Sequence, residues 1–351
     1  MSYPFGLSPM GIGSILDHTF RIYRRNFAAI ALFCLLIGGL GQFLVLLLQS
    51  LLLGGAYATS IQGLFSSYIN LLSGDNIYSP DYAQDTMRYA TNVLGALVMP
   101  MLLGLLTSLF VTPFVTGGVV NITAAYYHGV VDKPAVWFGR VRQTYGKLVR
   151  TGFARMVCMG ASILALFFVF FVIAFAIGII TAAISGVIAG IFFVFFLIVF
   201  IAVVAAAIVV LISWIEMLYP VAVVENQYGF RGIGRSFKIF TKNFWKIVLL
   251  IILCGSIATA VTMPLQMVTV AFAFMSEGFP YLLMSVISNV ISALLTALTA
   301  PLLPIAITLA YFDTRIRREG YDIAVRQRDQ TSAEALAPKE EIYEPTFTPG
   351  N

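Results

Sequence analysis

The sequence predicts an all-α fold: a polytopic membrane helix bundle with six transmembrane helices and basic amphipathic interfacial helices. Composition, segment length and the placement of charge lead to this fold class. Of 351 residues, 60% are hydrophobic and 11% are charged, and the mean hydropathy is +0.92. A soluble domain carries about 25% charged residues. Most of this chain therefore has the bilayer as its solvent.

Six segments are apolar enough to span a bilayer, which takes about 20 helical residues. The first is too long for the apolar core of a signal peptide and is predicted to be a permanent span. The third and fourth contain no charged residue between Met156 and Ile215, which predicts a tight hairpin that turns within residues 185–190. The predicted spans are about 27–53, 93–119, 156–180, 188–215, 247–274 and 281–312.

These spans belong to one integral membrane domain, residues 1–328, with an interfacial helix at about 9–26. Residues 329–351 are rich in Pro, Glu, Ala and Thr, and we expect a disordered cytoplasmic tail. The connection at about 54–91 is predicted to form a small helical or partly ordered cap. Five prolines are expected to kink or interrupt spans two, five and six: Pro100, Pro113, Pro264, Pro301 and Pro304.

The placement of cations predicts the orientation. All of the 21 Lys and Arg except Arg88 fall in the two terminal segments and in the connections after spans two and four. The positive-inside rule then puts both termini in the cytoplasm. A count of five or seven spans would mix the two groups, so the asymmetry supports both the count and the direction.

One short phrase occurs twice, each time just before a span. TFRIYRRNF (Thr19–Phe27) and SFKIFTKNF (Ser236–Phe244) differ at one position if Thr/Ser, Arg/Lys and Tyr/Phe are equivalent. A weaker third version lies at about 137–152. The pattern favours three repeats of an interfacial helix followed by two spans. The alternative is that basic and aromatic flanks recur in unrelated membrane proteins.

Each copy has the spacing of an amphipathic helix. The predicted apolar faces comprise Ile12, Ile15, Leu16, Thr19, Ile22, Tyr23 and Phe27 in the first copy, and Ile233, Phe237, Phe240 and Phe244 in the second. Asn26 and Asn243 lie where the chain turns into the membrane, and each is expected to cap the start of the following helix. This composition suits helices that lie in the headgroup zone.

The cations of these helices are predicted to face anionic lipid headgroups, which contribute about 1 kcal/mol for each cation. Their position beside the spans favours lipid over nucleic acid. Beyond membrane lipids, the partners expected are another membrane protein or a second copy of the chain. The lipid-facing set is Arg21, Arg24, Arg25, Arg140, Lys147, Arg150, Arg235, Lys238 and Lys242.

Polar residues recur at helical spacing within spans one, five and six. One interpretation is interhelical packing, because small and hydroxyl residues let helices approach and hydrogen-bond one another. The other is a water-accessible cavity that holds a lipid headgroup or small solute. The residues concerned are Gln42, Gln49, Thr262, Gln266, Asn289, Ser292 and Thr296.

The residue pattern indicates neither an enzyme nor a cofactor or metal site. No nucleotide-binding, hydrolase or metalloprotease motif occurs. His18 and His128 lie on predicted flanks, and Cys34, Cys158 and Cys254 inside spans. Glu225, at the end of the fourth span, is expected to pair with Arg231 or Arg235. The function expected is a non-catalytic scaffold, assembly partner or regulator, with transport or lipid handling as the alternative.

Four stretches together resemble a bacterial family of multi-pass proteins. They are GIGSILDHTFRIYRRNF (Gly11–Phe27), PFVTGGVVNITAAYYHG (Pro113–Gly129), YPVAVVENQYGFRGIGRSFKIFTKNFWKI (Tyr219–Ile247) and AYFDTRIRREGYD (Ala310–Asp322). The family includes YciC-like proteins and the membrane domain fused to some glycerophosphoryl diester phosphodiesterases. The resemblance implies a protein of the bacterial plasma membrane. It implies no phosphodiesterase activity, because the residues of that catalytic barrel are not in this chain.

Overall fold

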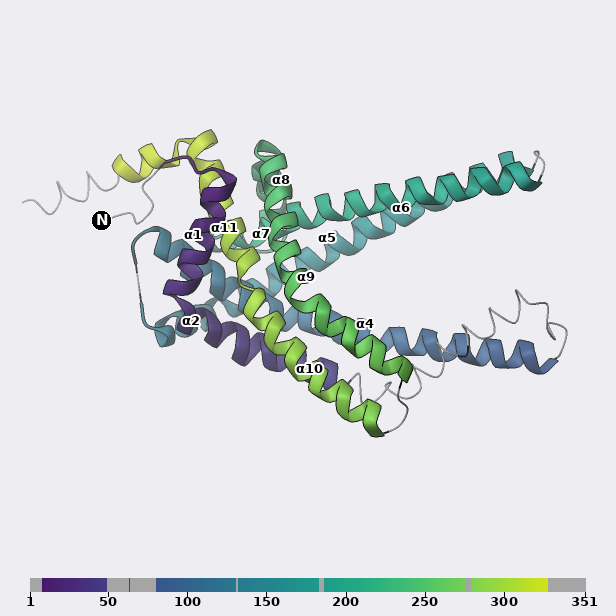
Figure 1. Cartoon of the computed structure of the whole chain (residues 1–351). Coiled ribbons are helices and arrows are strands. Elements are labelled where there is room, and N and C mark those ends of the chain that lie inside the picture. The colour runs from purple at the N-terminus through teal and green to yellow at the C-terminus, as the bar shows by residue number, and fades with distance from the viewer. Residues whose placement is uncertain are drawn as a thin grey trace, which may run out of the picture.

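The computed structural model describes residues 8–48, 63, 80–130, 132–182, 186–275 and 279–327, and its regular elements there are all helical (Figure 1). This confirms the all-α prediction. The elements are α1 (Ile12–Arg25), α2 (Phe27–Ala31), the π-helix η1 (Leu32–Gly39), α4 (Pro80–Tyr127), α5 (Pro134–Ala182), α6 (Gly186–Glu216), α7 (Leu218–Glu225), α8 (Arg231–Lys242), α9 (Phe244–Met275), α10 (Phe279–Thr299) and α11 (Leu302–Glu319).

Six segments of the described chain are long and apolar enough to cross a membrane, as predicted. The helices that contain them also extend past the predicted spans, since α4 has 48 residues and α5 has 49. The candidate spans are Phe27–Leu48, Met101–Tyr127, Pro134–Ala176, Phe195–Glu225, Phe244–Val268 and Val286–Glu319. α6 begins at Gly186, so residues 186–190 of the predicted turn are helical; residue 185 and the predicted tail from residue 329 lie outside the described residues.

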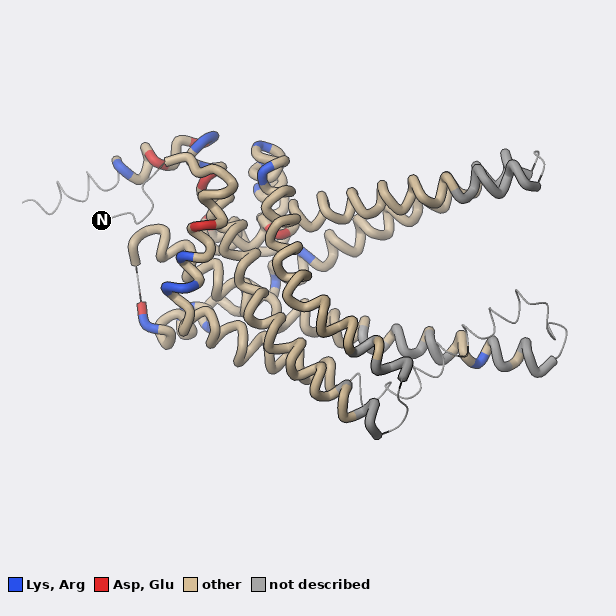
Figure 2. Tube along the Cα trace, in the orientation of Figure 1, with Lys and Arg blue, Asp and Glu red and all other residues tan. Residues whose placement is uncertain are grey.

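The helices meet at one end and diverge at the other (Figure 1). We call the meeting point the head; it contains α1, α7, α8 and α11 with the adjoining ends of α4, α5 and α9. The α5–α6 hairpin leaves it as one arm, while α4 and the α9–α10 pair leave it in another direction. Lys, Arg, Asp and Glu gather in the head, and the described parts of the arms carry almost none (Figure 2).

The core of the head is built around α11. Its residues from Ile305 to Thr314 are all buried, and α1, α4, α7, α8 and α9 contact it. The ring of Phe312 stacks on Tyr127 from α4, with centroids 4.3 Å apart. Full burial of one large apolar side chain contributes about 1.5–3 kcal/mol. An 18-residue helix surrounded in this way holds the head together.

The repeated phrase forms a break between two helices in both copies. α1 ends at Arg25 and α8 at Lys242, and the chain then turns into α2 and α9. Equivalent residues are buried, because Ile22 and Ile239 are both 0% exposed, and Thr19 and Ser236 are both 1% exposed. The phrase therefore specifies a packing face as well as a turn.

The predicted capping role of the asparagines is wrong. Asn26 makes no side-chain hydrogen bond to the start of α2; its Nδ2 instead donates to the Ile22 carbonyl, 3.2 Å away at the end of α1. Asn243 Nδ2 donates to Asp313 and to Thr314 of α11. The last carbonyls of a helix lack intrahelical partners, so an amide donor at this position has acceptors behind it.

The protein covers only part of the predicted apolar face of α8. Phe240 is buried in the protein, but Phe237 is 51% exposed and packs edge-on against Trp214. Ile239 takes the buried position beside Gly232 and Ser236. A Cβ on Gly232 would lie 2.6 Å from the Gln227 carbonyl oxygen, so the small residue permits this close approach.

The middle copy of the phrase forms no break between helices. α5 runs unbroken from Pro134 to Ala182, and this stretch contains no asparagine to mark a turn.

Of the prolines expected to kink or interrupt spans, Pro301 lies in the break between α10 and α11, so the sixth span consists of two helices. Pro100, Pro113 and Pro264 lie inside helices that continue past them.

Candidate functional site

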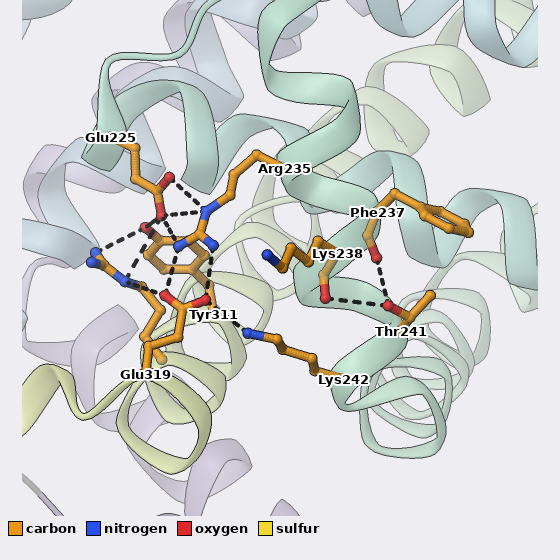
Figure 3. A network of polar contacts seen from close by, with 9 residues as sticks. Glu225, Arg235, Phe237, Lys238, Thr241, Lys242, Tyr311 and Glu319 are labelled. Atoms are coloured by element: carbon orange, nitrogen blue, oxygen red, sulfur yellow. Dashed lines mark hydrogen bonds and ion pairs between the residues drawn. The ribbon is translucent and has the colours of Figure 1, made fainter.

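A network of ion pairs joins the ends of α7, α8 and α11 (Figure 3). Arg235 lies at its centre, with Nε 2.8 Å from Glu225 Oε2 and Nη2 2.6 Å from Glu319 Oε2. Lys242 Nζ lies 3.1 Å from Glu319, and Tyr311 Oη donates to Glu225 at 2.8 Å. This confirms the expected pairing of Glu225 with Arg235 and not with Arg231.

The network has one more cation than carboxylates. Arg315 completes it, with Nε 3.4 Å from Glu319 and its guanidinium over the Tyr321 ring. Hydrogen bonds to Glu225 and then to Glu319 raise the pKa of the Arg235 guanidinium. Two carboxylates thus face three cations, and the five side chains are 12–28% exposed. In a partly buried pair, removal of one partner leaves the other charge without compensation.

A second group of charges, the Asp313 cluster, fixes the N-terminal segment to the head. The Asp313 side chain is fully buried, and it accepts a hydrogen bond from the Met10 backbone N–H at 2.7 Å. Arg317 Nε lies 3.0 Å from Asp313, and Lys246 Nζ also contacts its carboxylate. Lys246 and Arg317 both donate to the Met10 carbonyl as well. Here one carboxylate faces two cations.

A third pair stands at the base of the α5–α6 arm. Arg155 of α5 contacts Glu216 of α6, with side chains 19% and 10% exposed. Arg155 also lies over the ring of Tyr219. This ion pair joins the two helices where they leave the head.

Sequence reasoning missed most of these carboxylates. The sequence predicts a partner for Glu225 but none for Asp313, Glu319 or Glu216. The available signal was helical spacing, since Asp313–Arg317 and Arg315–Glu319 are both i, i+4 pairs. A carboxylate that directly follows an apolar run also signals burial, because it needs a cationic partner there.

An open cleft lies between these charge clusters and the membrane-spanning part of α9. It has a volume of about 1,130 Å³, and we call it the corner cleft. Its walls come from residues 9–12, from the α8–α9 corner with Lys242, Trp245 and Lys246, and from the end of α11 with Arg317 and Arg318. Trp245 is 80% exposed. The cleft thus combines cations with an exposed aromatic ring.

A smaller cavity of about 180 Å³ lies between the first span, α4 and the α10–α11 break. Among the predicted polar residues, Gln42 and Thr296 line it. Thr107, Thr112 and Thr116 of α4 line it too, and sequence reasoning did not single them out. We call it the span cavity; its volume is that of about six water molecules.

The other predicted cavity residues lie elsewhere. Asn289 Nδ2 donates to the Leu46 carbonyl at 3.2 Å and so links α10 to the first span. Thr262 Oγ1 donates to the Ala258 carbonyl of its own helix. Gln266 is exposed, and Ser292 is half-buried without lining the span cavity. Gln49 lies outside the described residues.

The residues predicted to face lipid headgroups fall into two groups. Some contact the protein: Arg235 and Lys242 in the network, Arg25 with Tyr126, Arg140 with Asp132, and Lys147 over Tyr228. The others are exposed and make no ion pair with a described residue: Arg21, Arg24, Arg150 and Lys238. The structure does not bring all of them to one surface patch.

The histidines and cysteines are dispersed. His128 lies 3.3 Å from Tyr321 Oη, and burial together with the Arg21 charge lowers the pKa of His18. Cys34, Cys158 and Cys254 are free thiols. Within the described ranges no three His, Cys, Asp or Glu side chains come close enough to hold a metal ion.

Comparisons with protein-family models, with curated proteins and with solved structures found no match.

Proposed function

We propose that this chain is a multi-pass protein of a bacterial plasma membrane that acts as a non-catalytic scaffold for other membrane proteins. The head lies in the cytoplasm, with both termini on that side. The arms cross the bilayer and hold partner helices or a second copy of the chain.

The distribution of charge supports this orientation. The head contains nearly all described cations, while the arms are apolar (Figure 2). Cationic segments stay on the cytoplasmic side during insertion. The head therefore faces the cytoplasm.

The ion pairs of the head support a structural role. Glu225, Glu319, Asp313 and Glu216 each contact at least one cation from a different helix. The cations occupy the oxygens of these carboxylates. These groups fix helices relative to one another.

The observation that carries the proposal is the isolation of the α5–α6 arm. In the most apolar window of the third span no residue is buried, against 39% for the sixth span. Phe171 and Phe195 are 69% and 66% exposed, and the hairpin is held by its own contacts, such as the Phe170–Phe200 stack. Spans of multi-pass proteins normally pack on one another. An arm that no other described span covers offers its surface to the spans of a partner.

Site-specific photo-crosslinking in native membranes tests this role. A photoreactive residue at Phe171 or Phe195 should yield a defined product with another membrane protein or with a second copy. The same residue at Phe230, an exposed head position, is the matched control. Products with lipid alone at both arm positions would contradict the scaffold role.

The span cavity favours a second candidate function, the handling of a small polar solute or lipid headgroup. Gln42 lines it, and its side chain hydrogen-bonds no described residue. In a cysteine-free background, Cys at Thr296 should react with a hydrophilic thiol reagent if the cavity opens to water. Cys at Asn289 serves as comparison, because Asn289 makes a packing contact. Absence of labelling at Thr296 would reject this candidate.

A further inference from the structure

The corner cleft has a surplus of positive charge. Asp313 is shared by Lys246 and Arg317, and the network behind Lys242 pairs two carboxylates with three cations. Arg318 also lines the cleft and makes no ion pair with any described residue. Among the described residues of the wall, Asp322 is the one carboxylate. The excess of cations makes the cleft attractive to an anion.

The same cleft opens onto an apolar path. Trp245 lies in its wall at 80% exposure, followed along α9 by Leu249 at 43% and Ile252 at 45%. Spacings of four and three residues put these side chains on one face of the helix. Tryptophan is enriched at the level of lipid headgroups. The cations thus lie at headgroup level, and the apolar path points into the bilayer.

We propose that the corner cleft binds one anionic glycerophospholipid, with the phosphate held by Lys242 and Arg318 and an acyl chain laid along Trp245, Leu249 and Ile252. This rests on the proposed membrane insertion of α9 but not on the scaffold role. A free phosphate would use the cations alone and leave the apolar path empty. A zwitterionic lipid would bring its own cation toward the cationic wall. An anionic lipid satisfies both features.

Native mass spectrometry of the full chain in neutral detergent tests the site, with equal amounts of phosphatidylglycerol and phosphatidylcholine added. The wild-type protein should retain one phosphatidylglycerol in preference. Arg318→Gln should weaken this retention about fivefold, since a cation at the surface contributes about a factor of five. Trp245→Ala should weaken it without altering any ion pair. Lys238→Gln on the same helix as Lys242 is the matched control, because Lys238 does not line the cleft.

Three outcomes would overturn the proposal. These are equal retention of both lipids, an equal loss in the Lys238→Gln control, or unchanged retention in both Arg318→Gln and Trp245→Ala. Size-exclusion profiles identify a variant that fails to fold. If Arg318→Gln fails to fold, lipid retention by Trp245→Ala tests the proposal. Lipid retention by purified protein does not depend on a partner. Failure of the α5–α6 crosslinks and failure of the lipid site are therefore separate results.

Discussion

The carboxylate of Asp313 accepts a hydrogen bond from the backbone N–H of Met10, which lies 303 residues earlier in the chain. Lys246 contacts the same carboxylate and the Met10 carbonyl. A fully buried Asp therefore connects the N-terminal segment, the start of α9 and the centre of α11. The contribution of the Asp313–Lys246 ion pair to stability is measured by removing each of the two charges singly and then both together.

Asp313→Leu should destabilise the protein by about 3–5 kcal/mol, because the mainly buried Lys246 loses its counter-ion. Combining it with Lys246→Met should recover part of this loss, because no unpaired charge remains. Thermal unfolding in detergent measures both effects. Asp322→Asn is the control. Additive losses in the double variant would show that the two side chains are not coupled.

Arg235→Ala should lower stability by about 2–4 kcal/mol, because Glu225 and Glu319 lose their bidentate partner. Arg235→Lys should recover only part, since an ammonium group cannot bridge two carboxylates in the planar geometry of a guanidinium. Lys238→Ala, one turn further along the helix, should stay within about 0.5 kcal/mol of wild type. Equal melting temperatures for Arg235→Ala and Lys238→Ala would show that the network does not stabilise the head.

The repeated phrase provides a matched pair of substitutions in each copy. Ile22→Ala and Ile239→Ala should each cost about 2–5 kcal/mol, because both side chains are completely buried. Phe20→Ala and Phe237→Ala should cost much less, because these rings are 45% and 51% exposed. Thermal unfolding of the four variants checks the packing face. Larger losses at the phenylalanines would contradict the assignment.

Much of the fold follows from the sequence, but the side-chain partners do not. Apolar length and cation placement predict the six spans, and the Asn–Phe pairs predict the breaks at Asn26 and Asn243. Periodicity alone cannot tell whether lipid or protein covers an apolar face: Phe237 and Phe240 were both placed on that face, and only Phe240 is buried in the protein. Helical spacing indicates the pair of Asp313 with Arg317. The contacts of Asp313 with Met10 and Lys246 come from distant parts of the chain and have no such signal. Polar spacing predicted Gln42 and Thr296 as cavity residues, and both line the span cavity. The threonines of α4 line it only because three spans pack together there, which spacing within one helix does not indicate.

Charge reversal tests the orientation of the whole chain. Glu at Arg24, Arg25, Lys238 and Lys242 removes cations from the flanks of the first and fifth spans that are proposed to be cytoplasmic, so insertion should weaken or the topology should shift. An alkaline phosphatase fused near Arg142 should be inactive in the wild type, because the proposed orientation puts that connection in the cytoplasm. Gln at the same four positions is the control for lost ion pairs without added negative charge. Periplasmic phosphatase activity in the wild-type fusion would contradict the orientation, and unchanged topology and abundance of the Glu variant would show that these cations do not direct insertion.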